Sequence, residues 1–184
     1  MILITAFELF GGSGTNASWE VLKKLPGVLA GHPVKKLLLP VVFGKAAETA
    51  LHTRADFIFL LGEAGGRKAV TPERKARNLR DARIPDNAGT QPRGQRILPQ
   101  GPEEYRTVLP LEEIVSDMRD AAIAVSEDAG AFVCNDTFYL VGVGSACPVE
   151  FIHVPAVSEH AEEYAETVRR FIEIAVNKVT ATVT

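Results

Sequence analysis

Cysteine is scarce in this sequence: the 184 residues include only two, Cys134 and Cys147. Two thiols do not suggest a disulfide framework, and a chain that uses a free thiol for chemistry needs a reducing compartment. We therefore expect a cytoplasmic protein. Cys147 precedes a proline and has no base in its own motif, so it is expected to be structural or incidental.

The sequence also lacks a basic run and a long apolar run. Its formal net charge is −3, with 20 Lys and Arg against 23 Asp and Glu, which favours neither nucleic acid nor an anionic membrane as a partner. No stretch approaches the roughly 20 apolar residues of a membrane span. Residues 1–7 contain no basic segment and are expected to form a strand, not a signal peptide. A hydrophobic content of 46% is typical of one soluble domain, expected to span residues 1–184.

Apolar runs of strand length alternate with stretches of helical character. This alternation predicts an α/β fold, a single domain with a mostly parallel twisted sheet and helices on both faces. The functional residues would then lie at the carboxyl ends of the strands, where Phe7, Glu63 and His153 fall. Strands are expected at 2–7, 34–42, 56–61, 123–125 and in the run ending at 153, and helices at 16–25, 45–54, 110–122, from about 134, and at 158–176.

The segment 78–102 is less regular than the rest. It is rich in Arg, Pro and Gly and contains no repeat. We interpret it as a long active-site loop or lid, with some strand at 75–81. An interface arm is the alternative.

Cys134 ends a hydrophobic approach and is followed by polar residues, which suits a nucleophile at an element boundary. A helix beginning there would present unpaired N–H groups and a positive dipole end to the sulfur, and both stabilise a thiolate. The alternative is a buried structural cysteine, the commoner fate of a free thiol.

Histidine is also scarce, with four residues. His32 lies in a Gly-His-Pro turn, and His52 and His160 fall in polar stretches. His153 differs because it ends a short apolar run just before Val154-Pro, which predicts a strand with an imidazole at its end. Alone it would be a satisfied core residue, but beside Cys134 at one sheet edge it becomes a general base.

The third group of such a site is a carboxylate that orients the base. Glu73 follows a Gly-rich segment and precedes several arginines. The pattern alone does not distinguish that role from a surface ion pair with Arg74 or Arg77.

Taken together, these residues resemble the pyroglutamyl peptidase I family, cysteine peptidases that remove an N-terminal pyroglutamate. The resemblance runs through nearly the whole chain. Residues 5–12 look like the family's Phe-Glu-Pro-Phe-Gly-Gly signature, and the long stretch 62–92 is similar to its longest motif. Phe-Val-Cys-Asn at 132–135 and Phe-Ile-His-Val-Pro at 151–155 complete four blocks in the family's order.

The resemblance implies a single catalytic domain with a nucleophile (Cys134), a base (His153), an orienting carboxylate (Glu73) and an arginine that stabilises the oxyanion (Arg83). It implies a substrate pocket with Asn16 at its mouth. The positions that match the family's lactam-binding residues are Phe7, Phe10, Ile84, Phe132 and Val133. It also implies peptide substrates with an N-terminal pyroglutamate, no metal or organic cofactor, and a homodimer or homotetramer.

The chain departs from the family pattern at several positions. Glu63 replaces a usual Gln, and if its carboxylate contacts the lactam it can only accept hydrogen bonds while ionised. Leu9 replaces the signature proline, Ala6 replaces a glycine, and Asp136 stands where His is frequent. None of these changes the expected triad, so the reaction class is better determined than the substrate preference.

Two alternatives to a peptidase remain at this point. The Gly-rich segments at 10–14 and 62–67 follow expected strands and resemble phosphate-binding loops, although neither fits Gly-x-Gly-x-x-Gly and no Gly-Lys-Ser/Thr follows. The other alternative is a family member with altered specificity or no activity, acting as a binding protein.

Overall fold

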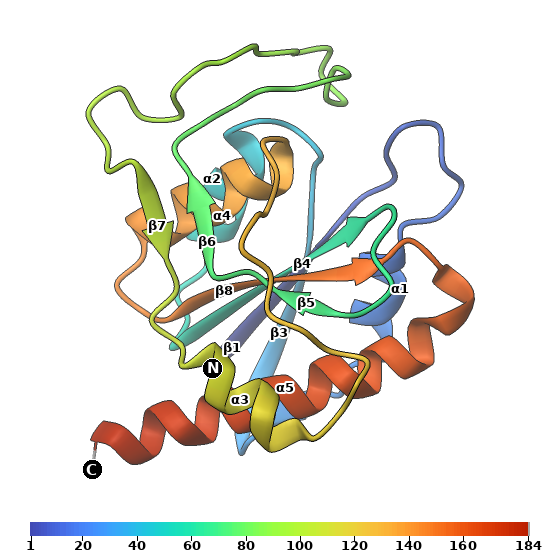
Figure 1. Cartoon of the computed structure of the whole chain (residues 1–184), viewed down its shortest axis with the longest axis vertical. Coiled ribbons are helices and arrows are strands. Elements are labelled where there is room, and N and C mark those ends of the chain that lie inside the picture. Colours follow the sequence, from blue (N-terminus) through green and yellow to red (C-terminus); the bar gives the residue numbers. More distant parts are fainter. Residues whose placement is uncertain (184) are drawn as a thin grey trace.

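A six-stranded sheet forms the centre of the molecule in the computed structural model, which describes residues 1–183 (Figure 1). The strand order is β2-β3-β1-β4-β8-β5, and the four central strands run parallel. The short edge strands β2 and β5 pair antiparallel. The strand bounds are Ile2–Phe7 (β1), Val28–Leu29 (β2), His32–Leu39 (β3), Phe57–Ala64 (β4), Thr71–Pro72 (β5) and Val149–Pro155 (β8).

Helices cover both faces of this sheet, as the sequence predicts (Figure 1). One apolar cluster joins even-numbered residues of β1 to α1, α3 and α5, and the other joins Leu3 and Phe7 of the same strand to α2 and α4. Both faces of a central parallel strand are buried, which explains its continuous apolar sequence. The helix bounds are Ala17–Lys24 (α1), Lys45–Leu51 (α2), Leu111–Met118 (α3), Val133–Gly144 (α4) and Ala161–Val183 (α5), the last preceded by a 3₁₀ turn at Ser158–His160 (η1).

Most of the predicted elements are present, with corrections at 123–125 and at the end of the last helix. The run 123–125 does not form a strand: it makes only an isolated bridge between Val70 and Ile123. The last helix extends beyond residue 176 to Val183. The predicted strand at 2–7 and the helix start near Cys134 are confirmed.

The segment 78–102 crosses over the α2–α4 side of the molecule (Figure 1). It connects β6 (Lys75–Arg77) to β7 (Glu104–Arg106), which form a two-stranded antiparallel ribbon. Asn78 holds the far part of the segment, since its side-chain oxygen accepts from the backbone N–H groups of Ile97 and Leu98. The predicted strand at 75–81 is therefore shorter than expected and ends at Arg77.

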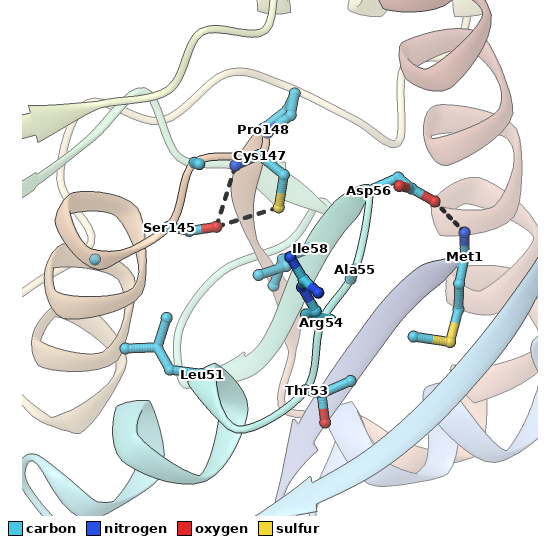
Figure 2. A pocket seen from close by; sticks show the side chains of 12 residues that line it. Met1, Leu51, Thr53, Arg54, Ala55, Asp56, Ile58, Ser145, Cys147 and Pro148 are labelled. Atoms are coloured by element: carbon cyan, nitrogen blue, oxygen red, sulfur yellow. Dashed lines mark hydrogen bonds and ion pairs between the residues drawn. The ribbon is translucent and has the colours of Figure 1, made fainter.

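A cleft of about 760 Å³ opens at the amino ends of the central strands, beside Met1, Ile58 and Pro148 (Figure 2). Phe7 and His153 lie toward the opposite ends of their strands. Its lining includes Cys147, whose sulfur lies 3.2 Å from the hydroxyl oxygen of Ser145. The two cysteines therefore lie at opposite ends of the sheet. Among the described residues, no helix combines the length and the apolar character that crossing a bilayer requires.

Candidate active site

Cys134 lies in the first turn of α4, directly after the N-cap residue Phe132 and Val133. Its sulfur packs against the backbone of Gly62 in β4, where an added Cβ would come within 3.0 Å of the Sγ atom. Gly62 is the register partner of His153 in β8. The missing side chain at residue 62 therefore lets the thiol approach the strand pair that carries the imidazole.

His153 and Glu73 form a buried hydrogen-bonded pair. The Nδ1 atom of His153 lies 2.7 Å from Oε1 of Glu73, and their side chains are 5% and 0% exposed. The antiparallel contact of β5 with β8 positions the glutamate, whose N–H donates to the carbonyl of Phe151 at 2.8 Å. An ionised carboxylate can only accept, so a hydrogen bond to it requires the proton on Nδ1 and leaves Nε2 of a neutral ring unprotonated.

This geometry excludes one of the two interpretations of Glu73. A surface ion pair with Arg74 or Arg77 is wrong, because those arginines bind other acids: Arg74 pairs with Glu112 and Glu127, and Arg77 pairs with Asp128. Glu73 turns inward because its neighbours in β5 pair with the strand that holds His153.

Arg67 is a site residue that the sequence reasoning missed. Its guanidinium lies 2.9 Å from Oε1 of Glu73 and also donates to the hydroxyl of Thr71 at 2.6 Å. This charge-assisted contact holds the side chain of Glu73 in place no less than His153 does, because both groups bind the same oxygen, Oε1. The only signal in the sequence is the position of Arg67 at the end of the Gly-rich segment 62–67.

The surroundings of Cys134 favour the thiol over the thiolate. Protein atoms enclose the sulfur except where it faces a cavity, and this burial, followed by the negative charge of Glu73, raises the pKa of Cys134 to about 12. The positive charge of Arg67 acts in the opposite direction and only partly offsets the effect. The start of α4 therefore does not offset the effect of burial on this thiol.

A cavity of about 120 Å³ lies beside Cys134. Its aromatic walls are packed together, with the ring of Phe10 centred 5.0 Å from that of Phe132. Six of the predicted pocket residues line it, and Thr15 and Val41 are two that the sequence reasoning did not identify. The lining is Phe7, Phe10, Thr15, Asn16, Val41, Glu63, Phe132, Val133 and Cys134.

Asn16 and Glu63, two polar residues of this lining, hold the start of α1. The oxygen of Asn16 accepts from the N–H and the hydroxyl of Ser18, and its amide donates to the carbonyl of Glu8. One carboxylate oxygen of Glu63 accepts from the N–H of Ala17 at 2.5 Å. A carboxylate suits this place because the first turn of a helix has unpaired N–H groups and positive dipole.

Arg83 and Ile84 lie in a neighbouring cavity of about 700 Å³, which shares Phe10 and Phe132 with the first. Both residues are exposed, and neither lines the cavity that contains Cys134. Their roles at the oxyanion and at the lactam stay predictions. Asp81, Arg83 and Ile84 of the segment 78–102 line this neighbouring cavity, and the role of the segment as an active-site loop stays a prediction.

Comparison with known proteins identifies the family of this chain. The family model described as pyroglutamyl peptidase matches residues 1–184. The chain belongs to the pyroglutamyl peptidase family. It is therefore an enzyme, a hydrolase of the peptidase class, and the nucleotide-binding alternative for the Gly-rich segments is removed.

Relatives and solved structures agree with this assignment. A pyrrolidone-carboxylate peptidase of Levilactobacillus brevis is 44% identical over 169 residues, which cover 86% of this chain and 83% of the relative. A mutant pyrrolidone carboxyl peptidase of Pyrococcus furiosus superposes with a TM-score of 0.88 at 33% identity, covering 97% and 99% of the two chains. The pyroglutamyl peptidase I of Bacillus amyloliquefaciens superposes with a TM-score of 0.82 at 36% identity, covering 95% and 91%.

Proposed function

We propose that this enzyme hydrolyses the amide bond after an N-terminal pyroglutamyl residue, with Cys134 as nucleophile, His153 as base and Glu73 as orienting carboxylate. The observation that carries the proposal is the 2.7 Å bond between Nδ1 of His153 and Oε1 of Glu73. Cys134 lies close to this pair, because a Cβ added at Gly62, the register partner of His153, would come within 3.0 Å of its sulfur. Family membership supports the same substrate class.

The reaction follows from the protonation states. Nε2 of His153 takes the proton of the Cys134 thiol as the sulfur attacks the carbonyl carbon that follows the lactam ring. The C–N bond breaks when His153 returns this proton to the leaving amine, and a thioester remains on Cys134. Water, deprotonated by His153, then releases free pyroglutamate and restores the thiol. Glu73 keeps its negative charge throughout and stabilises the imidazolium.

The oxyanion of the tetrahedral intermediate needs donors at the same place. The backbone N–H of Cys134 in the first turn of α4 is one candidate, and the guanidinium of Arg83 is the other. Each donor in comparable sites contributes about 3 to 4 kcal/mol of transition-state stabilisation. Arg83 would have to move from the neighbouring cavity toward Cys134 when the substrate binds.

The cavity beside Cys134 suits a neutral ring. A pyroglutamyl terminus has no ammonium group because its nitrogen is closed into a lactam, so Phe7 and Phe10 can bury it without stranding a charge. The ring N–H and C=O still need partners, and backbone groups near Glu63 and Phe132 are the candidates. A site built to satisfy both groups rejects a ring that lacks them.

The bond from Ala17 supports a structural role for the Glu63 carboxylate, with ring recognition by backbone groups. Glu63→Gln should therefore keep kcat/KM for a pyroglutamyl amide within about threefold, because the amide oxygen of Gln can accept the same bond. A tenfold or larger rise of kcat/KM in this variant would show that the carboxylate opposes lactam binding.

The experiment that tests the function compares two fluorogenic amides, pyroglutamyl and prolyl 7-amido-4-methylcoumarin. The enzyme should release the dye only from the pyroglutamyl substrate, and Cys134→Ser should abolish release. Cys147→Ser is the matched control, because this thiol lies at the other end of the sheet. Absence of turnover by the unchanged protein would favour the alternative, a family member that only binds. A homodimer or homotetramer and a cytoplasmic location stay predictions.

A further inference from the structure

Asp136 is a charged residue inside α4 that the proposed reaction does not use. It lies in the first turn of the helix, two residues after Cys134, and its side chain is 0% exposed. One carboxylate oxygen accepts from Nε of Arg80 at 2.6 Å, and the other accepts from the N–H of Gly44 at 2.7 Å. Asp136 thus binds two other segments of the chain to the helix that carries the thiol.

Arg80 brings in the long segment 78–102. Its backbone is fixed to the returning part of that segment by two hydrogen bonds with Gln95, at 2.7 and 2.9 Å. Its guanidinium lies over the ring of Phe43, with 5.6 Å between the guanidinium carbon and the ring centre. A planar cation stacked on an aromatic face orients that ring as well as attracting it.

Phe43 passes this contact on to the cavity wall. Its ring packs edge-on against Phe132 at 5.3 Å, and Phe132 in turn packs against Phe10 at 5.0 Å. Phe43 itself does not line the cavity beside Cys134, whereas the other two rings do. The backbone of Phe43 is also tied down, since its N–H donates to the buried carboxylate of Asp86 at 3.0 Å.

We propose that Asp136 and Arg80 are positioning residues that fix the aromatic wall of the substrate cavity through Phe43, and so determine how tightly the ring of the substrate is held. The proposal rests on the proposed function for the identity of the substrate. The path runs from Asp136 to Arg80, Phe43, Phe132 and Phe10, and each step is a direct contact.

The ion pair of Asp136 and Arg80 has a feature that an apolar pair at the same positions would not have. Burial raises the pKa of Asp136, while the bonds from Arg80 and Gly44 lower it, so the carboxylate depends on its partners. Apolar residues of the same volume commonly match the stability of a buried ion pair. An apolar pair would lack the guanidinium that lies over the Phe43 ring and the carboxylate that holds this guanidinium in place.

The test separates positioning from folding by comparing KM with kcat. Asp136→Asn and Arg80→Met should each raise KM for the pyroglutamyl coumarin amide about 10-fold, in the range measured for side chains in direct contact, with kcat changed less than threefold. The double variant should raise KM no more than either single change, because both act on one path. Arg80→Lys keeps the charge but not the planar stack, and its KM should fall between the wild type and Arg80→Met.

Two further variants keep the result decisive. Arg96→Met is the matched control, because it removes an ion pair with Glu103 from the same segment without touching the aromatic wall, and it should leave KM unchanged. Phe43→Leu breaks the path without stranding a buried charge, so it serves where the Asp136 or Arg80 variants do not fold, and it should also raise KM about 10-fold.

An unchanged KM in Phe43→Leu, or an equal loss of kcat in the Asp136 and Arg80 variants with KM preserved, would overturn the proposal. Turnover by the wild type with no effect of these variants rejects the positioning role alone. A wild type with no turnover rejects the proposed function, and the positioning role falls with it.

Discussion

The replacement Glu73→Gln separates the two effects that Glu73 exerts on the site. The glutamate holds the imidazole of His153 through a 2.7 Å bond and is fully buried. A glutamine can present its amide nitrogen to Nδ1, which then accepts, so that Nε2 carries the proton and cannot act as a base. The loss of kcat from such a change in comparable triads is about 10⁴-fold. We expect a decrease of this size in hydrolysis of the pyroglutamyl coumarin amide.

The same replacement should make the thiol more reactive toward a small reagent. The negative charge of Glu73 is the second cause, after burial, of the raised pKa of Cys134. Removing the charge lowers the pKa, although burial keeps it above the ordinary value, and each unit of decrease gives about tenfold more thiolate. Alkylation by iodoacetamide at pH 7 should therefore become faster.

The assay follows both quantities in one protein. Dye release gives kcat, and mass spectrometry of the alkylated peptide gives the rate at Cys134, in a Cys147→Ser background that removes the second thiol. A resting pair of thiolate and imidazolium would predict the opposite sign, because Glu73 stabilises the imidazolium. Slower alkylation in Glu73→Gln, or a kcat within tenfold of the wild type, would refute the reasoning.

Other predictions address the packing and the charges of the site. Gly62→Ala should lower kcat/KM at least about 100-fold, since its Cβ would meet the Phe151 ring at 2.6 Å and the thiol at 3.0 Å, whereas Gly65→Ala meets no atom within 4 Å and should stay active. Arg67→Met should slow alkylation of Cys134 at pH 7, because the arginine lowers the pKa of that thiol. The carboxyl of Glu150 is fully buried, and this burial raises its pKa well above the ordinary value even though polar contacts with Thr107 and nearby backbone lower it. The folded state therefore holds this proton more tightly than the unfolded state, and stability is lost as the pH rises above about 4.3. Glu150→Gln removes that loss, so thermal denaturation should show a gain over the wild type that grows by up to about 1.4 kcal/mol per pH unit; a gain independent of pH would contradict this assignment.

The regular part of the fold was predictable because burial on both faces leaves a clear pattern. The apolar run at 2–7 matches β1, and Asn16 caps α1 as a residue of its type should. The edge strands β2 and β5 contain two residues each, too few to carry a periodic signal. The last helix was predicted too short because the β-branched residues near its end have low helix propensity.

The site shows a different limit. Cys134 and His153 stand out because polar, reactive residues end apolar runs, and the family resemblance assigns them roles. Neither the inward turn of Glu73 nor its contact with Arg67 can be read from the pattern, because both depend on the antiparallel pairing of β5 with β8. The helix-capping bond of Glu63 likewise joins residues 46 positions apart. Contacts of this kind are set by tertiary packing.

The most direct measurement traps the acyl-enzyme. The enzyme is mixed with an excess of a pyroglutamyl ester, quenched in acid within the first turnovers, digested and analysed by mass spectrometry. The account predicts a pyroglutamyl group on the peptide that contains Cys134, sensitive to hydroxylamine as a thioester is, and absent from Cys134→Ser. Rapid turnover in the wild type with the label on another residue, or undiminished turnover in Cys134→Ser, would contradict it.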